Sequence, residues 1–586
     1  MSLKKLGILT AVLILLGAYF YFYEIRVERE KKEAEEKAKK VIIFKPEEIE
    51  ELKLKINGKI LLFSKKGEQW AIKEPVVAKA DNASIEKALA VIKKAEIERT
   101  INEKPDNLKD YGLEKPSMEI TIKEKDKSPL ETILIGNRNP TDYYVYFKKE
   151  SSLPVKLTYS GLKNHLSKGV YYYRDKTVLN LKVEDIKGLY VRYKDKKADL
   201  KLDDKGDWQI ISPIRTKADG GRFRRLLYGL SNSRIGAFVE EDPKDLKKYG
   251  LDSSDKEITF FTDKKHPVKS LLIGNRARDG FYTKWRDEKN VFFISKNSLR
   301  DYPKTEFDLR DKTIMDFNKE KIVKVELKYP HDRIMVVSDK KNVWNIIKPK
   351  EVSADEFEIS DLLWAILDME AKKFISEVST DSKTYNLDKP LVEINLWEKG
   401  KKKPLRLVIS KRGNGKKELF AKTSARETIY QVSPDILKDI IKTTFNLRDK
   451  TILTFKNEEV GKLQLKYSDK TLVLKLVKGE WKTMKPEETK LNKAEVISFL
   501  WDIKLLKFKE ILSDGLKEDL SMYGFDKPEA NIALWGNKED KIGTIIIGKK
   551  ATDKDILYAK VDSSPTIYGI DPKFLEKLPY SINDFK

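Results

Sequence analysis

Four copies of one unit of about 137 residues make up most of this 586-residue chain. The repeat is marked first by a tryptophan that returns at intervals of 138, 136 and 137 residues. A proline follows each tryptophan by five residues, and an aspartate or asparagine follows it by eleven. Because these markers keep one phase, they predict one fold repeated in tandem. In chain order they are Trp70, Trp208, Trp344 and Trp481; Pro75, Pro213, Pro349 and Pro486; and Asp81, Asp219, Asp355 and Asn492.

Three further markers recur in the same phase. A Tyr-Gly-Leu step comes first, then an Ile-Gly step, and an Arg-Asp-Lys step falls where one copy meets the next. The glycine of the first step is typical of the left-handed residue that ends a helix, and asparagine tolerates the same conformation. These steps are Tyr111-Gly112-Leu113, Tyr249-Gly250-Leu251, Tyr385-Asn386-Leu387 and Tyr523-Gly524-Phe525; Ile135-Gly136, Ile273-Gly274, Ile409-Ser410 and Ile547-Gly548; and Arg174-Asp175-Lys176, Arg310-Asp311-Lys312 and Arg448-Asp449-Lys450.

Each unit is predicted to be α+β. In the first copy Asn57-Gly58 separates two alternating segments, a signal for a tight hairpin. The tryptophan lies on a third strand and is expected to fill the core, and the aspartate eleven residues later is expected to cap a central helix. We expect two small antiparallel sheets in each unit. One shared helix position is expected to form a packing face of varying size, and it holds Ala90, Tyr228, Trp364 and Trp501.

The N-terminus carries a candidate membrane anchor. Leu6 to Tyr23 are eighteen residues without a charge, which nearly span a hydrocarbon core of about 30 Å. Lys4 and Lys5 precede this segment, so a cleaved signal peptide is the alternative. Long domains translocate largely regardless of flanking charge, and we therefore expect the rest of the chain to be extracytoplasmic.

The predicted organisation is one transmembrane helix followed by a stalk and four tandem units. The stalk is rich in helix formers and charges and lacks an apolar stripe. The segments are 1–23 (anchor, span 6–23), 24–40 (charged helical stalk), 41–179 (repeat 1), 180–316 (repeat 2), 317–454 (repeat 3) and 455–586 (repeat 4).

The distribution of charge limits which classes of partner this chain is expected to bind. Charged residues reach 36% and the net charge is +24, but acids interleave with bases and the longest basic run is Lys401-Lys402-Lys403. A nucleic-acid binder concentrates its basic residues, so no nucleic-acid partner is expected. An anionic lipid, glycan or wall polymer remains an alternative. Cysteine is absent, which excludes disulfides, thiolate nucleophiles and cysteine-bound zinc.

Catalytic and metal-binding patterns are not found. His165, His266 and His331 occupy unrelated phases of their repeats and are interpreted as surface residues. The segment 203–207 begins like a calcium loop but lacks the acidic residue at position twelve, so we interpret it as a turn. The sequence therefore assigns no catalytic, cofactor-binding or metal-binding residue, and no cofactor is expected.

Three recurrent features have both a structural and a binding interpretation. The Arg-Asp-Lys steps are interpreted as ion-paired elbows between units. Cations after the Ile-Gly step indicate hairpin turns, with anion binding as the alternative. Tyrosine clusters indicate strand packing, with stacking on sugars or bases as the alternative. The cations are Arg138, Arg276, Arg412, Lys549 and Lys550, and the clusters are Tyr143, Tyr144 and Tyr146, and Tyr171, Tyr172 and Tyr173.

The combined motifs resemble a bacterial family called domain of unknown function 4340. Trp208-Gln209-Ile210, Pro213, Ala218-Asp219 and Leu272-Ile273-Gly274 carry the likeness, which extends over residues 41–586. The resemblance implies a membrane-anchored, exported protein encoded beside gliding-type ABC transporter components. It carries over no catalytic residues.

Anchor, repeats and resemblance together favour a non-enzymatic, membrane-anchored, extracytoplasmic repeat protein. We expect it to act as an accessory or scaffold subunit of an ABC-type transporter or envelope complex, with protein partners such as transporter subunits. A binding module for an anionic glycan, wall polymer or lipid is the second hypothesis. An enzyme of unknown type is the third.

Overall fold

The computed structural model describes residues 3–125, 129–262, 267–378, 382–412, 418–513 and 519–586. It contains four nine-stranded antiparallel sheets, one in each repeat, and every sheet has the same strand order. The chain divides into two compact units, Met1–Asp311 and Lys312–Lys586, with two sheets in each. The predicted α+β class with four tandem copies is confirmed.

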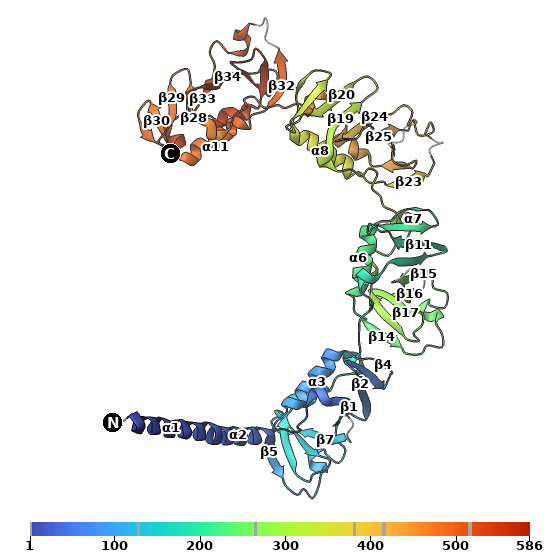
Figure 1. The fold of residues 1–586 in the computed structure, drawn as a ribbon. Coiled ribbons are helices and arrows are strands. Elements are labelled where there is room, and N and C mark those ends of the chain that lie inside the picture. The colour runs from blue at the N-terminus through green and yellow to red at the C-terminus, as the bar shows by residue number, and fades with distance from the viewer. Residues whose placement is uncertain (1–2, 126–128, 263–266, 379–381, 413–417, 514–518) are drawn as a thin grey trace. The chain divides into compact units, whose positions relative to one another are not determined.

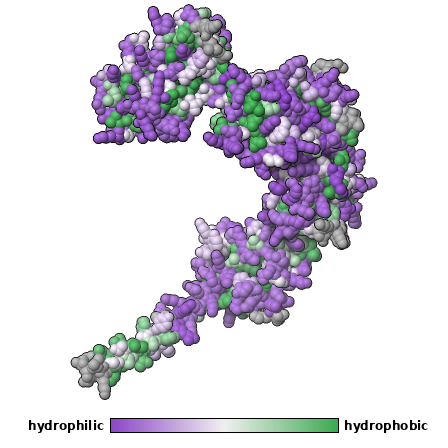
Figure 2. All heavy atoms as spheres, turned by 45° about the horizontal axis from the view of Figure 1, so that its top comes forward, coloured by the Kyte–Doolittle hydropathy of each residue, from purple (hydrophilic) through white to green (hydrophobic). Residues whose placement is uncertain are grey.

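The N-terminal helix begins the chain (Figure 1). It comprises α1 (Leu3–Tyr19), a π-helical segment η1 (Phe20–Ile25) and α2 (Arg26–Ala38). Its stretch from Leu6 to Ala38 is long and apolar enough to cross a membrane, so it fits a membrane anchor or a signal sequence. Hydrophobic residues gather along it in Figure 2, whereas the visible surface of the repeats is mostly hydrophilic. In α2 the predicted i,i+4 ion pairs form, for example Arg26–Glu30 at 2.9 Å.

Repeat 1 shows the shared topology. Three strands and a short fourth form a meander from β1 outward, α3 (Asn82–Lys94) follows, and β5 crosses to the far edge of the sheet to pair with β9. Short helices η2 (Pro46–Glu48), η3 (Lys109–Tyr111), α4 (Gly161–Leu166) and α5 (Val170–Tyr173) connect the parts. In sheet order the strands are β4 (Ala78–Lys79), β3 (Gln69–Glu74), β2 (Lys59–Lys66), β1 (Ile49–Ile56), β6 (Met118–Glu124), β7 (Pro129–Arg138), β8 (Tyr144–Lys149), β9 (Val155–Tyr159) and β5 (Ile97–Asn102).

Repeat 2 has the same arrangement around α6 (Gly220–Ser231). Its short helices are η4 (Val183–Asp185), η5 (Lys247–Tyr249), η6 (Lys296–Leu299) and α7 (Glu306–Leu309). In sheet order the strands are β13 (Thr216–Lys217), β12 (Trp208–Ser212), β11 (Lys196–Leu202), β10 (Gly188–Tyr193), β15 (Lys256–Phe261), β16 (Lys269–Ala277), β17 (Gly280–Trp285), β18 (Val291–Ser295) and β14 (Ala237–Glu240).

Repeat 3 is built around α8 (Glu356–Leu367). Its short helices are η7 (Lys319–Lys321), η9 (Pro434–Ile436), α9 (Leu437–Ile440) and α10 (Thr444–Leu447). In sheet order the strands are β22 (Val352–Ser353), β21 (Trp344–Lys348), β20 (Arg333–Ser338), β19 (Ile322–Lys328), β24 (Val392–Glu398), β25 (Leu405–Lys411), β26 (Leu419–Thr423), β27 (Ile429–Val432) and β23 (Lys373–Ser376).

Repeat 4 is built around α11 (Lys493–Lys504). Its short helices are η10 (Asn457–Glu459), η11 (Leu520–Tyr523), η12 (Pro572–Lys577) and η13 (Ile582–Phe585). In sheet order the strands are β31 (Thr489–Lys490), β30 (Glu480–Lys485), β29 (Thr471–Val477), β28 (Val460–Lys466), β33 (Ala530–Gly536), β34 (Lys541–Lys550), β35 (Leu557–Val561), β36 (Ile567–Ile570) and β32 (Phe508–Ser513).

The sheets differ from the prediction in one respect. Two small sheets were expected in each unit, but one continuous sheet forms because the first strand of each meander pairs with the strand after the Tyr-Gly step. In repeat 1 this pair is β1 with β6, in antiparallel register from Leu52↔Ile122 to Ile56↔Met118. Such long-range pairing is set by tertiary packing and leaves no local signal in the sequence.

The backbone confirms the predicted hairpin turn, helix caps and left-handed residues. Asn57 and Gly58 both have positive φ, at 47° and 82°, as a type I′ hairpin requires. The carboxylate of Asp81 accepts a hydrogen bond from the Ser84 backbone N–H at 3.1 Å, so it caps α3. The equivalent residues cap α6, α8 and α11. The residue after each predicted tyrosine has positive φ, and these residues are Gly112, Gly250, Asn386 and Gly524.

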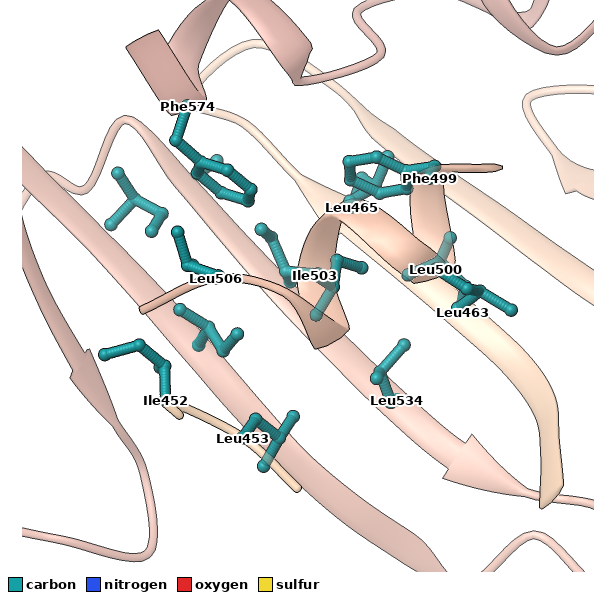
Figure 3. Close-up of a cluster of buried hydrophobic side chains, with 14 of the residues drawn as sticks. Ile452, Leu453, Leu463, Leu465, Phe499, Leu500, Ile503, Leu506, Leu534 and Phe574 are labelled. Carbon is teal, nitrogen blue, oxygen red and sulfur yellow. The ribbon is translucent and has the colours of Figure 1, made fainter. Parts of the chain in front are cut away.

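Each core lies between its sheet and its central helix. In repeat 4, Phe499, Leu500 and Ile503 of α11 pack with Leu463 and Leu465 of β28 (Figure 3). Three of the four marker tryptophans are buried as predicted, with exposures of 2% for Trp70, 6% for Trp208 and 3% for Trp481. Trp344 differs, because it is only half-buried at the edge of its core.

Candidate functional site

The Arg-Asp-Lys step of repeat 1 lies at its junction with repeat 2. Arg174 forms a backbone bridge to Ala80, and its side chain is 8% exposed. Its guanidinium lies 3.4 Å from the centre of the Phe238 ring and pairs with Glu241 at 2.5 Å, both in repeat 2. Cation–π and ionic contacts thus hold one buried side chain. Within this unit, the predicted ion-paired elbow is confirmed.

Further contacts tie the same two repeats together. Asp81, the cap of α3, also pairs with Arg234 of repeat 2 at 3.3 Å. Thr177 and Arg234 form a backbone bridge, and the Tyr171 hydroxyl donates a hydrogen bond to the Ile235 carbonyl at 2.9 Å. A cavity of about 570 Å³ lies beside these contacts and is lined by residues of both repeats. Repeats 1 and 2 are therefore docked through side chains, in addition to being joined by the chain.

The junction between repeats 3 and 4 uses the same design. The capping residue Asp355 pairs with Lys507 of repeat 4 at 2.8 Å, as Asp81 pairs with Arg234. Arg448 lies 5.1 Å from the centre of the Phe508 ring. Burial alone would raise the pKa of Asp355, but the hydrogen bond and charge of Lys507 outweigh it and lower the pKa. Asp355 therefore caps the central helix of repeat 3 and also forms an ion pair across the junction with repeat 4.

The shared helix position points outward, which corrects the prediction that it packs. Tyr228 is 42% exposed, Trp364 47% and Trp501 46%, and Ala90 is exposed as well. The core stripe of α8 is instead Ile359, Leu362, Leu363 and Ile366, which leaves residue 364 beside the stripe. Half-exposed tryptophan and tyrosine side chains are typical of protein interfaces. Repeats 2, 3 and 4 thus each present one aromatic ring at the same place.

Repeat 3 has a second exposed aromatic residue on its own central helix. Phe357 lies seven residues before Trp364 on α8, hence on the same side of the helix two turns earlier, and is 81% exposed. The sequence prediction missed Phe357, although its place outside the apolar stripe of the helix was the available signal. We call Tyr228, Phe357, Trp364 and Trp501 the outward aromatic residues.

The other candidate residues have structural surroundings. His165 and His331 are exposed as predicted, and His266 lies outside the described residues. The Asp203 carboxylate accepts hydrogen bonds from the Lys205 and Asp207 backbone N–H groups at 2.9 Å, so segment 203–207 is a turn. Among the residues that the structure describes, no three His, Cys, Asp or Glu side chains are grouped as a metal site would require.

The basic residues after the Ile-Gly step, and the tyrosine clusters, are largely engaged within their repeats. Arg138 donates to the Asn164 side-chain oxygen at 2.9 Å, and Lys550 pairs with Asp555 at 3.1 Å. Tyr173 is fully buried, whereas Tyr143, the residue before β8, is 68% exposed. Tyr144, Tyr146 and Tyr172 are half-buried, so the packing interpretation holds in full for Tyr173 alone among the six tyrosines.

An ionic network around the half-buried Glu393 on the sheet of repeat 3 was not predicted. Glu393 of β24 accepts hydrogen bonds from Lys328 at 2.8 Å and Asn395 at 2.9 Å, and also from Arg406. Burial would raise the pKa of Glu393, but these three donors outweigh it and lower the pKa to about 2. Alternating charges on neighbouring strands were the available signal. The network stabilises the sheet and leaves the carboxylate no proton to exchange near neutral pH.

Comparison with known proteins agrees with the repeat markers. A model of one family matches residues 70–209, 208–343, 344–493 and 481–586. Each match begins at a marker tryptophan, so the family's unit is offset from the structural repeat. The first two matches share residues 208–209, and the last two share residues 481–493. No curated protein matches the chain. The chain thus belongs, through four tandem matches, to the family described as Domain of unknown function (DUF4340).

Proposed function

We propose that this protein is a non-enzymatic, membrane-anchored scaffold whose repeats hold the subunits of an ABC-type transporter or envelope complex on the extracytoplasmic side. The observation that carries the proposal is the recurrence of a half-exposed aromatic ring at one helix position in repeats 2, 3 and 4. Within their repeats, the Tyr228 hydroxyl donates to Glu184 at 3.0 Å, and lysine ammonium groups lie 5.1 Å from the ring centre of Trp364 and 4.6 Å from that of Trp501. Repeat 1 has Ala90 at this position, so the fold of a repeat does not require a ring there.

Anchor and junctions support this proposal. The apolar N-terminal helix would tether the repeats to the membrane, with Lys4 and Lys5 on the cytoplasmic side. Side-chain contacts dock repeat 1 with repeat 2 and repeat 3 with repeat 4, so each pair would present its surface as one body. Burying one such ring against a partner contributes roughly 1–3 kcal/mol to the free energy of binding. The transporter as partner is what the resemblance to the family implies.

Affinity purification of the full-length chain from mild detergent tests the proposal. Wild type should recover an ABC permease together with its ATPase. A variant carrying Tyr228→Ser, Trp364→Ser and Trp501→Ser should recover at least tenfold less. The matched control carries Tyr143→Ser and Tyr159→Ser, two exposed tyrosines away from the central helices, and should recover as much as wild type. Recovery of the chain alone, under conditions that keep other membrane complexes intact, would refute the proposal.

A further inference from the structure

A cleft in repeat 3 separates the first half of α8 from the ends of β19, β20 and β21. Its volume is about 540 Å³, within the range of roughly 300–1,000 Å³ that small-molecule sites occupy. All of its lining residues belong to repeat 3, so it is separate from the junctions described above. Its wall includes Trp344, the marker tryptophan that is only half-buried.

Two differences from repeat 2 lie at this cleft. Across the β20–β21 pair Trp344 faces Ser338, whereas the equivalent tryptophans Trp208 and Trp481 face Leu202 and Leu476. Both leucines pack against their cores. In repeat 1 the facing residue is Lys65, whose side chain is half-buried beside Trp70.

The second difference lies at the start of the short helix before the first strand. In repeat 2 this position holds Val183, which packs against the core, and in repeat 3 it holds Lys319. Lys319 lines the cleft, and its ammonium group donates to the Ser360 hydroxyl at 3.0 Å. Small and cationic side chains thus stand where repeat 2 has apolar ones. The indole of Trp344 is left accessible from the cleft.

The lining combines an aromatic wall with polar and cationic edges. Ser338, Ser360 and Asn342 offer hydroxyl and amide groups. Lys340 and Lys399 are exposed at the cleft, and neither has an ion-pair partner within 4 Å among the described residues. Of the acidic lining residues, Asp339 accepts backbone hydrogen bonds from Lys341 and Val343 within its own turn. Glu320 pairs with Lys319 at 3.7 Å, and Glu356 at the start of α8 completes the acidic lining. Lys340 and Lys399 are the two lining lysines whose charge is available to a ligand's acidic group.

We propose that this cleft binds an acidic sugar unit, that is, a sugar ring carrying a carboxylate or phosphate. The C–H face of a sugar ring is apolar and fits an indole, whereas its hydroxyls need hydrogen-bonding groups at the edges of the site. The two lysines then pair with the acidic substituent. The outward aromatic residues are not part of the lining, and Lys319 of the lining lies 5.1 Å from the centre of the Trp364 ring. The site gives the anchored chain a contact with an anionic glycan.

Calorimetric titration of the full-length chain in detergent micelles tests this proposal. The probes are a hyaluronan tetrasaccharide, which carries glucuronate carboxylates, a neutral chitin tetrasaccharide and inorganic phosphate. We expect the acidic tetrasaccharide to bind with a dissociation constant between about 10 µM and 1 mM, at least tenfold tighter than the other two. Its affinity should fall as salt rises, because the lysines are exposed.

Variants identify the site. Ser338→Leu introduces the residue of repeats 2 and 4, so it should reduce affinity at least tenfold while the melting temperature is unchanged or raised. Lys340→Gln combined with Lys399→Gln should abolish the preference for the acidic probe. The control Lys205→Gln lies in the matching turn of repeat 2 and should bind as wild type does.

The outcomes against the proposal are equally specific. Absence of binding to the acidic probe at millimolar concentration, or unchanged binding by Ser338→Leu, overturns the site. Equal binding of the neutral tetrasaccharide, or of phosphate alone, overturns the assigned ligand class. The scaffold proposal stays separate, because Ser338→Leu should still recover the transporter subunits.

Discussion

Replacing Arg174 with alanine removes a buried side chain that ties repeat 1 to repeat 2. The guanidinium is 8% exposed and lies over Phe238, a contact that contributes about 1–2 kcal/mol when the cation is desolvated. Its partner Glu241 is 44% exposed, so solvent screening limits that ion pair to about 1 kcal/mol. The junction should therefore lose about 2–3 kcal/mol. The undocked population should rise by roughly 30- to 150-fold.

Distance measurements between two spin labels report this change directly. The chain lacks cysteine, so Lys87→Cys on α3 and Arg224→Cys on α6 would be the only labelled sites. Wild type should give a narrow distance distribution and Arg174→Ala a broad one. The exposed Arg215→Ala in repeat 2 is the control and should leave the distribution narrow. A broad distribution in wild type, or no broadening in Arg174→Ala, would refute the docked junction.

Three further predictions concern core, sheet and anchor. Trp481→Ala should destabilise repeat 4 by about 3–5 kcal/mol. Trp344→Ala should destabilise repeat 3 by less, because that ring is already half-exposed. Hydrogen exchange resolved by repeat measures both losses of stability, and equal losses would contradict this prediction. Because the folded pKa of Glu393 is lowered to about 2 from an ordinary 4.5, its network stabilises repeat 3 fully above pH 4.5 and less as the pH falls toward 2. Glu393→Gln should therefore lower the free energy of unfolding of repeat 3 by up to about 3 kcal/mol at pH 7. Hydrogen exchange in β24 should show that the difference in stability from wild type shrinks as the pH falls from 4.5 to 2. A difference that stays constant over this range would contradict the prediction. Deleting residues 1–23 should move the chain from the membrane to the soluble fraction, and persistence in a carbonate-washed membrane pellet would contradict the anchor.

Sequence reasoning succeeded where the determinant is local. Asn57-Gly58 specified a hairpin and Asp81 a helix cap, because each acts on backbone within a few residues of itself. The positions of the four repeats were predicted from markers of this kind. The continuous sheet was missed because the β1–β6 and β5–β9 pairs join segments far apart in the chain.

The surfaces were harder to predict, because hydrophobic residues were assumed to pack. Trp364 was placed in a packing face, yet the stripe from Ile359 to Ile366 already fills the side of α8 that faces the sheet. The cleft of repeat 3 follows from Ser338 and Lys319, which the repeat spacing of 136 residues aligns with Leu202 and Val183. The spacing does not show that Ser338 and Leu202 each face a marker tryptophan, which required the strand register. Once the strand register is known, equivalent positions of the four repeats can be compared with one another.

Photo-crosslinking in the native host tests the central claim most directly. A benzophenone amino acid at position 364 or 501 would occupy an outward aromatic site, and one at position 205 would occupy an exposed turn away from it. The scaffold proposal predicts crosslinks from positions 364 and 501 to an ABC permease and none from position 205. Crosslinks that form equally at all three positions, or no permease adduct at 364 and 501, would contradict it.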